Sequence, residues 1–309
     1  MREINYAQAI SEAIVEEMDR DPNVVYMGEC VEGRYGQKSF EMPISETGFT
    51  GIGVGAAIAG LRPIVEIMFI DLITLAMDPI VNQAAKIRYM FGGMASVPMV
   101  VRAPIGAYVS MSAHHSQSLE SWFSSVPGLK VAVPSNAYDA KGLMKAAIRD
   151  DNPVIFCDHK MLGGLKGKVP DEDYTIPIGK ANIARAGKDA TIVTYAFMAH
   201  KSLDAAEQLS QQGIEVEIVD LRSTLPIDEE TILNSVGKTG RLITVAEACG
   251  PCSVASEVAA IVMEKGFDLL KSPLRRIHAK FTPIPFAKIL EENVLPKTED
   301  IVTAVKSIV

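Results

Sequence analysis

The feature that most limits how this chain can fold is a strand–helix alternation that runs through it twice. Short apolar runs predict strands at 24–27, 64–69, 98–103, 129–133 and 154–157, and again at 191–195, 216–220 and 242–246. Helical spacing predicts helices from Tyr6 to the Asp21-Pro22 stop and at 71–91, 137–149, 199–212, 229–237, 254–265 and 298–308. The helix over 71–91 is expected to be kinked at Pro79. This alternation is typical of α/β folds, so we expect two parallel-type sheets flanked by helices.

An irregular stretch separates the two series. Periodicity fades after Gly163, and glycines, prolines and the acidic run 171–173 follow. We therefore expect a first domain over 1–170, a linker over 171–189 and a second domain over 190–309. A chain of 309 residues is long enough for two buried cores.

Composition excludes several classes of protein. The net charge of −8 does not favour binding to nucleic acid or to an anionic membrane. No apolar run is long enough to span a membrane, and the N-terminus shows no signal-peptide pattern. The 4 cysteines do not form a secreted disulfide framework, so we expect a cytoplasmic protein.

One segment places a carboxylate beside a run of small residues. Glu46 follows Met42-Pro43-Ile44-Ser45 and precedes a glycine-studded stretch that ends at Gly60. Small residues allow a flat ligand or another backbone to come close, and the N-terminus of a helix favours a negative charge. The alternative is a capped helix packed tightly on a sheet. Glu29, Asp71 and the His114-His115 loop each follow a predicted strand, where ligands bind in such sheets.

Three other sites can be weighed from the residues. Gly51, Gly53 and Gly55 superficially match a dinucleotide fingerprint with Asp71 downstream, but no hydrophobic strand precedes them directly. Cys249-Gly250-Pro251-Cys252 lies between a strand and a helix, which fits either a thiol oxidoreductase or a plain turn. A metal site at His114-His115 is disfavoured, because adjacent histidines do not easily face one ion. A loop histidine in acid–base chemistry fits better.

Taken together, many stretches resemble the β subunit of the thiamine-diphosphate-dependent decarboxylating component of 2-oxo acid dehydrogenase complexes. The resemblance covers nearly the whole chain. It rests on these motifs, in order: Pro43-Ile44-Ser45-Glu46, Ala59-Gly60-Leu61-Arg62-Pro63, Glu66-Ile67-Met68-Phe69, Gln83-Ala84-Ala85-Lys86, His115-Ser116-Gln117, Pro127-Gly128-Leu129-Lys130-Val131, Asp220-Leu221-Arg222 and Pro283-Ile284-Pro285-Phe286.

The resemblance implies a pyrimidine-binding domain followed by a transketolase C-terminal domain. It also implies an α2β2 heterotetramer in which an α subunit holds magnesium and the cofactor's diphosphate, while this chain holds the aminopyrimidine. That arrangement agrees with the absence here of a Gly-Asp-Gly motif followed by paired asparagines. A lipoyl acyltransferase core is the implied docking partner. Acetoin is the expected substrate on the segments 89–93, 97–102 and 115–119, with pyruvate and branched-chain 2-oxo acids as alternatives.

Site residues follow from the same resemblance. Glu46 matches the carboxylate that promotes the cofactor's imino tautomer, and Glu29 matches a second, supporting carboxylate. His115 matches the histidine that faces the reaction intermediate. Ile44 and Met68 match the lining of the pyrimidine pocket. Relatives also bind potassium through backbone carbonyls, which correspond to Met99, Ala147, Ile148, Asp150 and Asn152.

Two departures from the family pattern stand out. Leu72 occupies a position where relatives usually have an aromatic ring, so the stacking contribution to cofactor binding, about 1 kcal/mol, is lost. Glu29 and Glu46 are 17 positions apart, a shorter connection than in relatives. Either the loop is truncated or a segment is missing, and a non-catalytic homologue is therefore an alternative.

Overall fold

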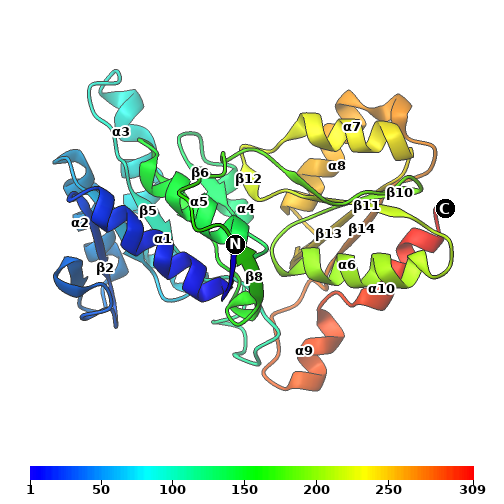
Figure 1. Ribbon diagram of the computed structural model, residues 1–309, viewed down its shortest axis with the longest axis horizontal. Coiled ribbons are helices and arrows are strands. Elements are labelled where there is room, and N and C mark those ends of the chain that lie inside the picture. Colours follow the sequence, from blue (N-terminus) through cyan, green and yellow to red (C-terminus); the bar gives the residue numbers. More distant parts are fainter. The chain divides into compact units, whose positions relative to one another are not determined.

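The computed structural model describes residues 1–309, which divide into two compact units (Figure 1). The first unit comprises Met1–Ile105 and Trp122–Ile178, and the second comprises Gly106–Ser121 and Gly179–Val309. The loop that carries His115 therefore groups with the second unit, although it lies early in the sequence. Each unit is described separately below.

A parallel sheet forms the centre of the first unit, with the strand order β6-β7-β5-β4-β2-β3. Its inner strands are buried on both faces, which explains their continuous apolar sequences. The strands are β2 (Val24–Gly28), β3 (Ser39–Glu41), β4 (Arg62–Glu66), β5 (Val100–Arg102), β6 (Lys130–Ala132) and β7 (Val154–Phe156).

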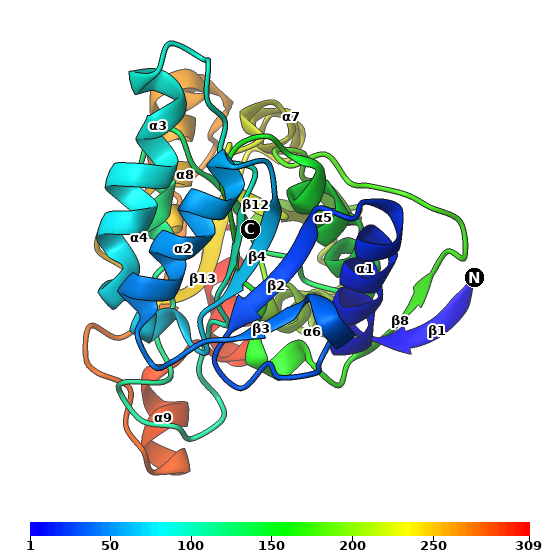
Figure 2. The ribbon, with the colours of Figure 1, turned by 90° about the vertical axis from the view of Figure 1, so that its left-hand side faces the viewer.

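Helices cover both faces of this sheet, with α2 on one side and α1 and α5 on the other (Figure 2). Gly53 allows α2 to lie close to the sheet, because a Cβ there would stand 2.6 Å from Val65 Cγ2. The predicted tight packing of this helix is therefore confirmed. The helices and the small antiparallel pair of this region are α1 (Tyr6–Arg20), α2 (Glu46–Ile58), α3 (Ala85–Met90), α4 (Glu120–Ser124), α5 (Ala137–Arg149), β1 (Arg2–Asn5) and β8 (Lys166–Val169).

The prediction over 71–91 of a long helix with a kink at Pro79 is right about the irregularity but not about a single α-helix. The segment consists of a 3-10 helix (Ile70–Ala76), a π-helix (Asp78–Ala84) and then α3. Pro79 causes the change, since it has no N–H to donate and its ring displaces the carbonyl four residues earlier. That carbonyl, on Leu75, instead accepts a hydrogen bond from the hydroxyl of Thr47 on α2.

The second unit has a five-stranded sheet in the order β14-β13-β10-β11-β9, in which only β9 runs antiparallel. Helices α6 and α10 cover one face, while α7 and α8 cover the other (Figure 1). The elements are β9 (Asn182–Arg185), β10 (Ala190–Thr194), α6 (Phe197–Ser210), β11 (Val216–Asp220), β12 (Ser223–Leu225), α7 (Glu229–Thr239), β13 (Leu242–Cys249), α8 (Val254–Lys265), β14 (Arg275–Ala279), α9 (Lys288–Val294) and α10 (Thr298–Lys306).

The stretch 171–189 is held at both ends by ordered contacts. Asp173 accepts hydrogen bonds from Lys145 Nζ at 2.7 Å and from Arg149 Nη2 at 2.9 Å, and both donors belong to α5. Further along, β9 pairs with β11. The residues expected to form a linker thus contain a strand of the second sheet as well as an ion-paired anchor on the first unit.

At Gly28, which ends β2, the central sheet leaves no room for a side chain. A Cβ at this position would lie 2.6 Å from the Glu66 carbonyl oxygen of β4. We expect Gly28→Ala to lower the free energy of unfolding by about 1–3 kcal/mol. Gly51→Ala is the matched control: it lies in α2 with nothing within 4 Å, and should raise the same quantity by about 0.5–1 kcal/mol. Equal effects in urea denaturation would contradict the assignment of close packing at Gly28.

Candidate active site

Three strands of the first unit end at one edge, and the predicted acidic residues follow them. Gly28 of β2 is in register with Glu41 of β3 and with Glu66 of β4. The loops that begin with Glu29, Met42 and Ile67 therefore leave the sheet together. This carboxyl edge is where parallel α/β sheets bind ligands.

Glu46 is the first residue of α2 and is only 5% exposed. Its carboxylate makes no hydrogen bond or ion pair within the chain. Ser45, the residue before it, does not cap the helix with its side chain, and the N-terminus of a helix favours a negative charge such as that of Glu46. A buried carboxylate without a partner is costly, which is typical of a group kept for a ligand.

Glu29 and Glu46 lie within electrostatic reach of each other. The pKa of Glu29 is raised, first by partial burial and then by the negative charges of Glu46 and Glu41. Glu29 likewise has no hydrogen-bond or ion-pair partner within the chain. The structure thus brings together the two carboxylates that the sequence singled out.

Apolar side chains at this edge are unusually exposed. Ile44, two residues before Glu46, is 85% exposed, and Met68 in the loop after β4 is 39% exposed. Leu72, in the following 3-10 helix, is partly buried. Ile44 and Met68, which were predicted to line the pyrimidine pocket, therefore lie on the surface in loops that leave this edge, where a ligand or partner chain would cover them.

A charged network that the sequence analysis missed lies beneath this edge. Glu66 accepts hydrogen bonds from Arg34 Nη1 at 2.7 Å, from Arg102 Nη1 at 2.6 Å and from the Tyr26 hydroxyl. Arg102 also donates to Asp158, at 2.8 and 3.1 Å. Burial alone would raise the pKa of Glu66, but the nearby charge of Arg102 and these hydrogen bonds lower it overall. The only sequence signal was a glutamate inside an apolar strand.

His115 lies in the loop 106–121 of the second unit and is partly buried, while His114 is exposed. Two buried carboxylates hold this loop. Glu247 accepts from the amide of Ala107 at 2.5 Å, and Glu291 accepts from the amide and hydroxyl of Ser110 at 3.1 Å. Tyr108, Ser110 and Ser112 all have positive φ, between 55° and 67°. Neither glutamate had a local sequence signal, because each is distant from the loop in the chain.

The carbonyls predicted to bind potassium are already engaged. Arg62 Nη1 donates to the carbonyl oxygens of Ile148 at 3.1 Å and Asp150 at 3.0 Å. The Met99 carbonyl accepts from Val154, and the Ala147 carbonyl accepts from the amide of Asp150. The side-chain oxygen of Asn152 accepts from Arg88. Arg62 thus donates to two of the five predicted carbonyls, and the potassium site stays a prediction.

The cysteine pair lies at the end of β13. Cys249 is partly buried, and its thiol donates to the Lys280 carbonyl at 3.4 Å, whereas Cys252 is exposed. Both cysteines are free thiols. No contact in this region places a substrate-binding surface beside them, so the thiol-oxidoreductase alternative gains no support here.

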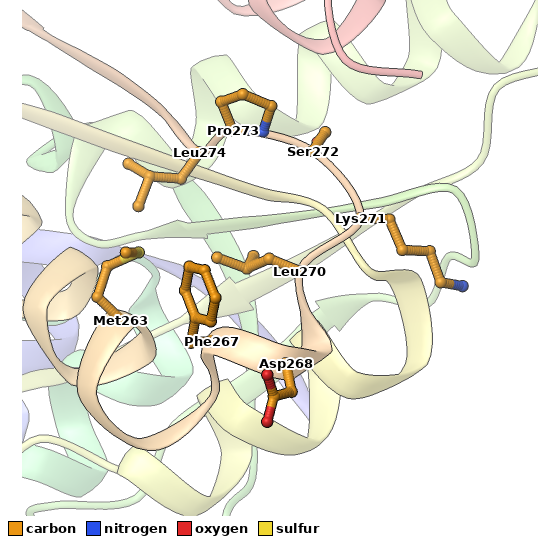
Figure 3. A pocket seen from close by; sticks show the side chains of 8 residues that line it. All are labelled: Met263, Phe267, Asp268, Leu270, Lys271, Ser272, Pro273 and Leu274. Atoms are coloured by element: carbon orange, nitrogen blue, oxygen red, sulfur yellow. The ribbon is translucent and has the colours of Figure 1, made fainter.

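Two surface hollows lie apart from the predicted acids and histidine, although Asn152 lines the second of them. One, of about 680 Å³, belongs to the second unit; Met263, Phe267, Leu270 and Leu274 point into it, while Lys271 points away (Figure 3). The other, of about 480 Å³, lies beside Tyr89 and Gly128 in the first unit. Neither is lined by Glu29, Glu46 or His115. No group of three or more His, Cys, Asp or Glu is arranged to hold a metal ion, and no helix is long and apolar enough to cross a membrane.

Comparison with known families identifies the two halves of the chain. The transketolase pyrimidine-binding domain matches residues 2–165, and the transketolase C-terminal domain matches residues 179–301. A solved structure described as a split-gene transketolase, an inactive β4 tetramer, superposes with a TM-score of 0.82 at 23% identity, covering 99% of this chain and 98% of that one. This neighbour supports the two-domain α/β fold predicted from the sequence.

Curated relatives define the family more closely. The β subunit of acetoin:2,6-dichlorophenolindophenol oxidoreductase from Cupriavidus necator is 44% identical over 328 residues, covering 99% of this chain and 97% of the relative. Its Bacillus subtilis counterpart is 45% identical, covering 98% and 96%. The pyruvate dehydrogenase E1 component subunit beta of Rhizobium meliloti is 45% identical, covering 100% and 70%. The chain belongs to this family of transketolase-type dehydrogenase β subunits, as its motifs predicted.

The raised pKa of Glu29 leads to a test on the isolated chain. The folded chain binds this proton more tightly than the unfolded chain does, so the stabilisation is full below the ordinary pKa of 4.5 and is lost as pH rises through the higher folded value. We expect Glu29→Gln to raise the melting temperature at pH 7 and to have no effect below pH 4.5. Calorimetry between pH 4 and pH 7 measures these melting temperatures, and Glu32→Gln is the control. A destabilised Glu29→Gln protein at pH 7 would contradict the coupling of the two acids.

Proposed function

We propose that this chain is the aminopyrimidine-binding β subunit of a thiamine-diphosphate-dependent acetoin dehydrogenase, active together with an α subunit in an α2β2 assembly. The observation that carries the proposal is the buried carboxylate of Glu46, which has no partner in the chain, at a sheet edge whose loops carry the exposed apolar residues Ile44 and Met68. A flat, partly apolar ring with a basic nitrogen would cover the apolar residues and give the carboxylate its missing hydrogen bond.

The chemistry of these residues follows from their surroundings. Thiamine diphosphate, when bound, supplies the nucleophilic carbon that attacks the substrate carbonyl. Glu46 would hold a proton between its carboxylate and the ring nitrogen, and burial strengthens that hydrogen bond. Glu29, whose raised pKa makes it a better proton acceptor, would relay protons to or tune Glu46. His115 would donate and accept a proton at the reacting group.

The α subunit would hold the magnesium and the diphosphate. A potassium ion would bind at the backbone carbonyls of Met99, Ala147, Ile148, Asp150 and Asn152, two of which also accept hydrogen bonds from Arg62. A lipoyl acyltransferase core would receive the acyl group, and the cytoplasm is the proposed compartment. The relatives include proteins named for acetoin and for pyruvate at equal identity, so the choice of acetoin rests on the segments 89–93, 97–102 and 115–119.

Co-expression with the α subunit tests the function. We expect the purified complex to reduce 2,6-dichlorophenolindophenol when supplied with thiamine diphosphate, magnesium and acetoin, and to act less on pyruvate or branched-chain 2-oxo acids. Glu46→Gln should lower kcat by at least about 10²-fold while the complex still assembles, and His115→Ala should lower it by about 10²–10⁴-fold. Glu32→Gln, on an exposed loop position, should behave as the unmodified chain.

The outcomes separate the alternatives. Retained activity in Glu46→Gln would remove the role given to that carboxylate. Turnover of pyruvate in preference to acetoin would reassign the substrate but not the site. A complex that assembles, binds the cofactor and turns over none of these compounds would favour a non-catalytic homologue.

A further inference from the structure

The connection between the two acids is short in comparison with relatives. The alignment with the Cupriavidus necator protein runs over 328 residues whereas this chain has 309, so at least 19 aligned positions have no residue here. The sequence places a shortening between Glu29 and Glu46. In the structure this segment is nevertheless a closed, hydrogen-bonded loop.

The carboxylate of Glu41 accepts hydrogen bonds from three consecutive backbone amides of that loop. Glu41 Oε1 accepts from the amide of Cys30 at 2.7 Å, and Oε2 accepts from those of Val31 at 2.7 Å and Glu32 at 2.8 Å. Cys30 adopts a left-handed conformation, with φ of 55°, which turns successive N–H groups to the same side. Successive amides arranged this way form an anion-binding concavity, which the chain fills with its own side chain. Such charge-assisted hydrogen bonds are stronger than neutral ones.

The strands next to this loop are fixed as well. Glu41 is the last residue of β3, which pairs with β2, and the amide of Met42 donates to the Gly28 carbonyl at 2.9 Å. Arg34, in the middle of the loop, donates to the Cys30 carbonyl at 3.0 Å and to Glu66 at 2.7 Å. Glu29 therefore lies between Gly28, which strand pairing fixes, and the Cys30–Glu32 turn, whose amides are bound by Glu41.

We propose that Glu41 is a positioning residue which, in place of a longer connection, holds the Cys30–Glu32 turn so that Glu29 faces Glu46. Glu41 acts through the backbone of the turn and does not touch substrate. The catalytic consequence of this placement rests on the function proposed above, but the placement itself can be measured without any activity. The short connection between Glu29 and Glu46 would therefore keep Glu29 in place without the residues that a longer connection has.

The charges around Glu29 make its titration a sensitive readout of this arrangement. Glu46 on α2 and Glu41 on β3 are the charged groups that raise its pKa, in addition to partial burial. Arg34 is on the same loop, but its guanidinium is paired with Glu66. Removing the charge of Glu41, or moving the turn away from Glu46, should each lower the pKa of Glu29.

Two measurements on the full chain test the proposal. Amide hydrogen exchange reports on the hydrogen bonds, and a carbon-13 titration of glutamate carboxyls, assigned with Glu29→Gln, reports on Glu29. In Glu41→Ala we expect the amides of residues 30–32 to exchange at least about tenfold faster, because each loses its acceptor. We expect the pKa of Glu29 to fall in the same variant. Glu32→Gln removes a loop carboxylate that accepts no hydrogen bond, and should change neither quantity.

Glu41→Gln keeps the shape of the side chain and covers the case in which Glu41→Ala does not fold. It should show the same direction of change in both quantities, with a melting temperature near that of the unmodified chain. Unchanged exchange at residues 30–32, or an equal change in Glu32→Gln, would overturn the proposal.

In the assembled complex, Glu41→Gln should lower kcat and leave the KM for acetoin unchanged. A complex of the unmodified chain that is inactive on every substrate would remove the proposed function but would leave the exchange and titration results valid. A Glu41→Gln complex with unchanged kcat, in an otherwise active system, would remove the positioning role alone.

Discussion

The buried charge network around Glu66 is the interaction on which the candidate site depends. Tyr26 comes from β2, Glu66 from β4 and Arg102 from β5, so their hydrogen bonds join three neighbouring strands near the carboxyl edge. Arg34 extends the network into the loop that follows Glu29. Removing one partner from such a buried group leaves an uncompensated charge, which costs about 3–5 kcal/mol. The network fixes the edge on which both unpartnered carboxylates stand.

Glutamate residues near this edge fall into two groups, according to whether the chain supplies hydrogen-bond donors to their carboxylates. Glu66 and Glu41 are satisfied by arginine and backbone donors, and the pKa of each is lowered overall. Glu29 and Glu46 have no such donors, and the pKa of Glu29 is raised. The four glutamates of this region thus divide into two whose carboxylates are bound by donors of the chain and two whose carboxylates are not. The division follows from which donors each one meets, since all four have the same side chain.

The sequence predicted the elements whose signals are local. Asn136 caps α5 by accepting from the amide of Asp139, and the predicted 137–149 and 254–265 coincide with α5 and α8. Predictions failed where a distant contact decides the outcome. At 71–91 the sequence located the irregularity at Pro79, but the hydrogen bond from the Thr47 hydroxyl to the Leu75 carbonyl depends on α2, which lies elsewhere in the chain. The strand expected over 64–69 ends at Glu66, because Ile67, Met68 and Phe69 belong to the loop that follows β4 despite being apolar. Family motifs brought out Glu29 and Glu46, but the donors that surround Glu41 and Glu66 come from loops and strands that only the fold brings together.

The anchoring of both ends of the 29–46 connection also bears on how such chains change during evolution. Strand pairing and the Glu41 carboxylate hold the residues next to Glu29, and the helix start holds Glu46, while Gly33 and Gly36 have open space around them. Residues between these anchors can be lost or gained without displacing either acid. The 44% identity with the Cupriavidus necator protein is reached over 328 aligned residues, more than the 309 of this chain, so members of the family differ in length. The segment is a place where length can vary while the chemistry is preserved.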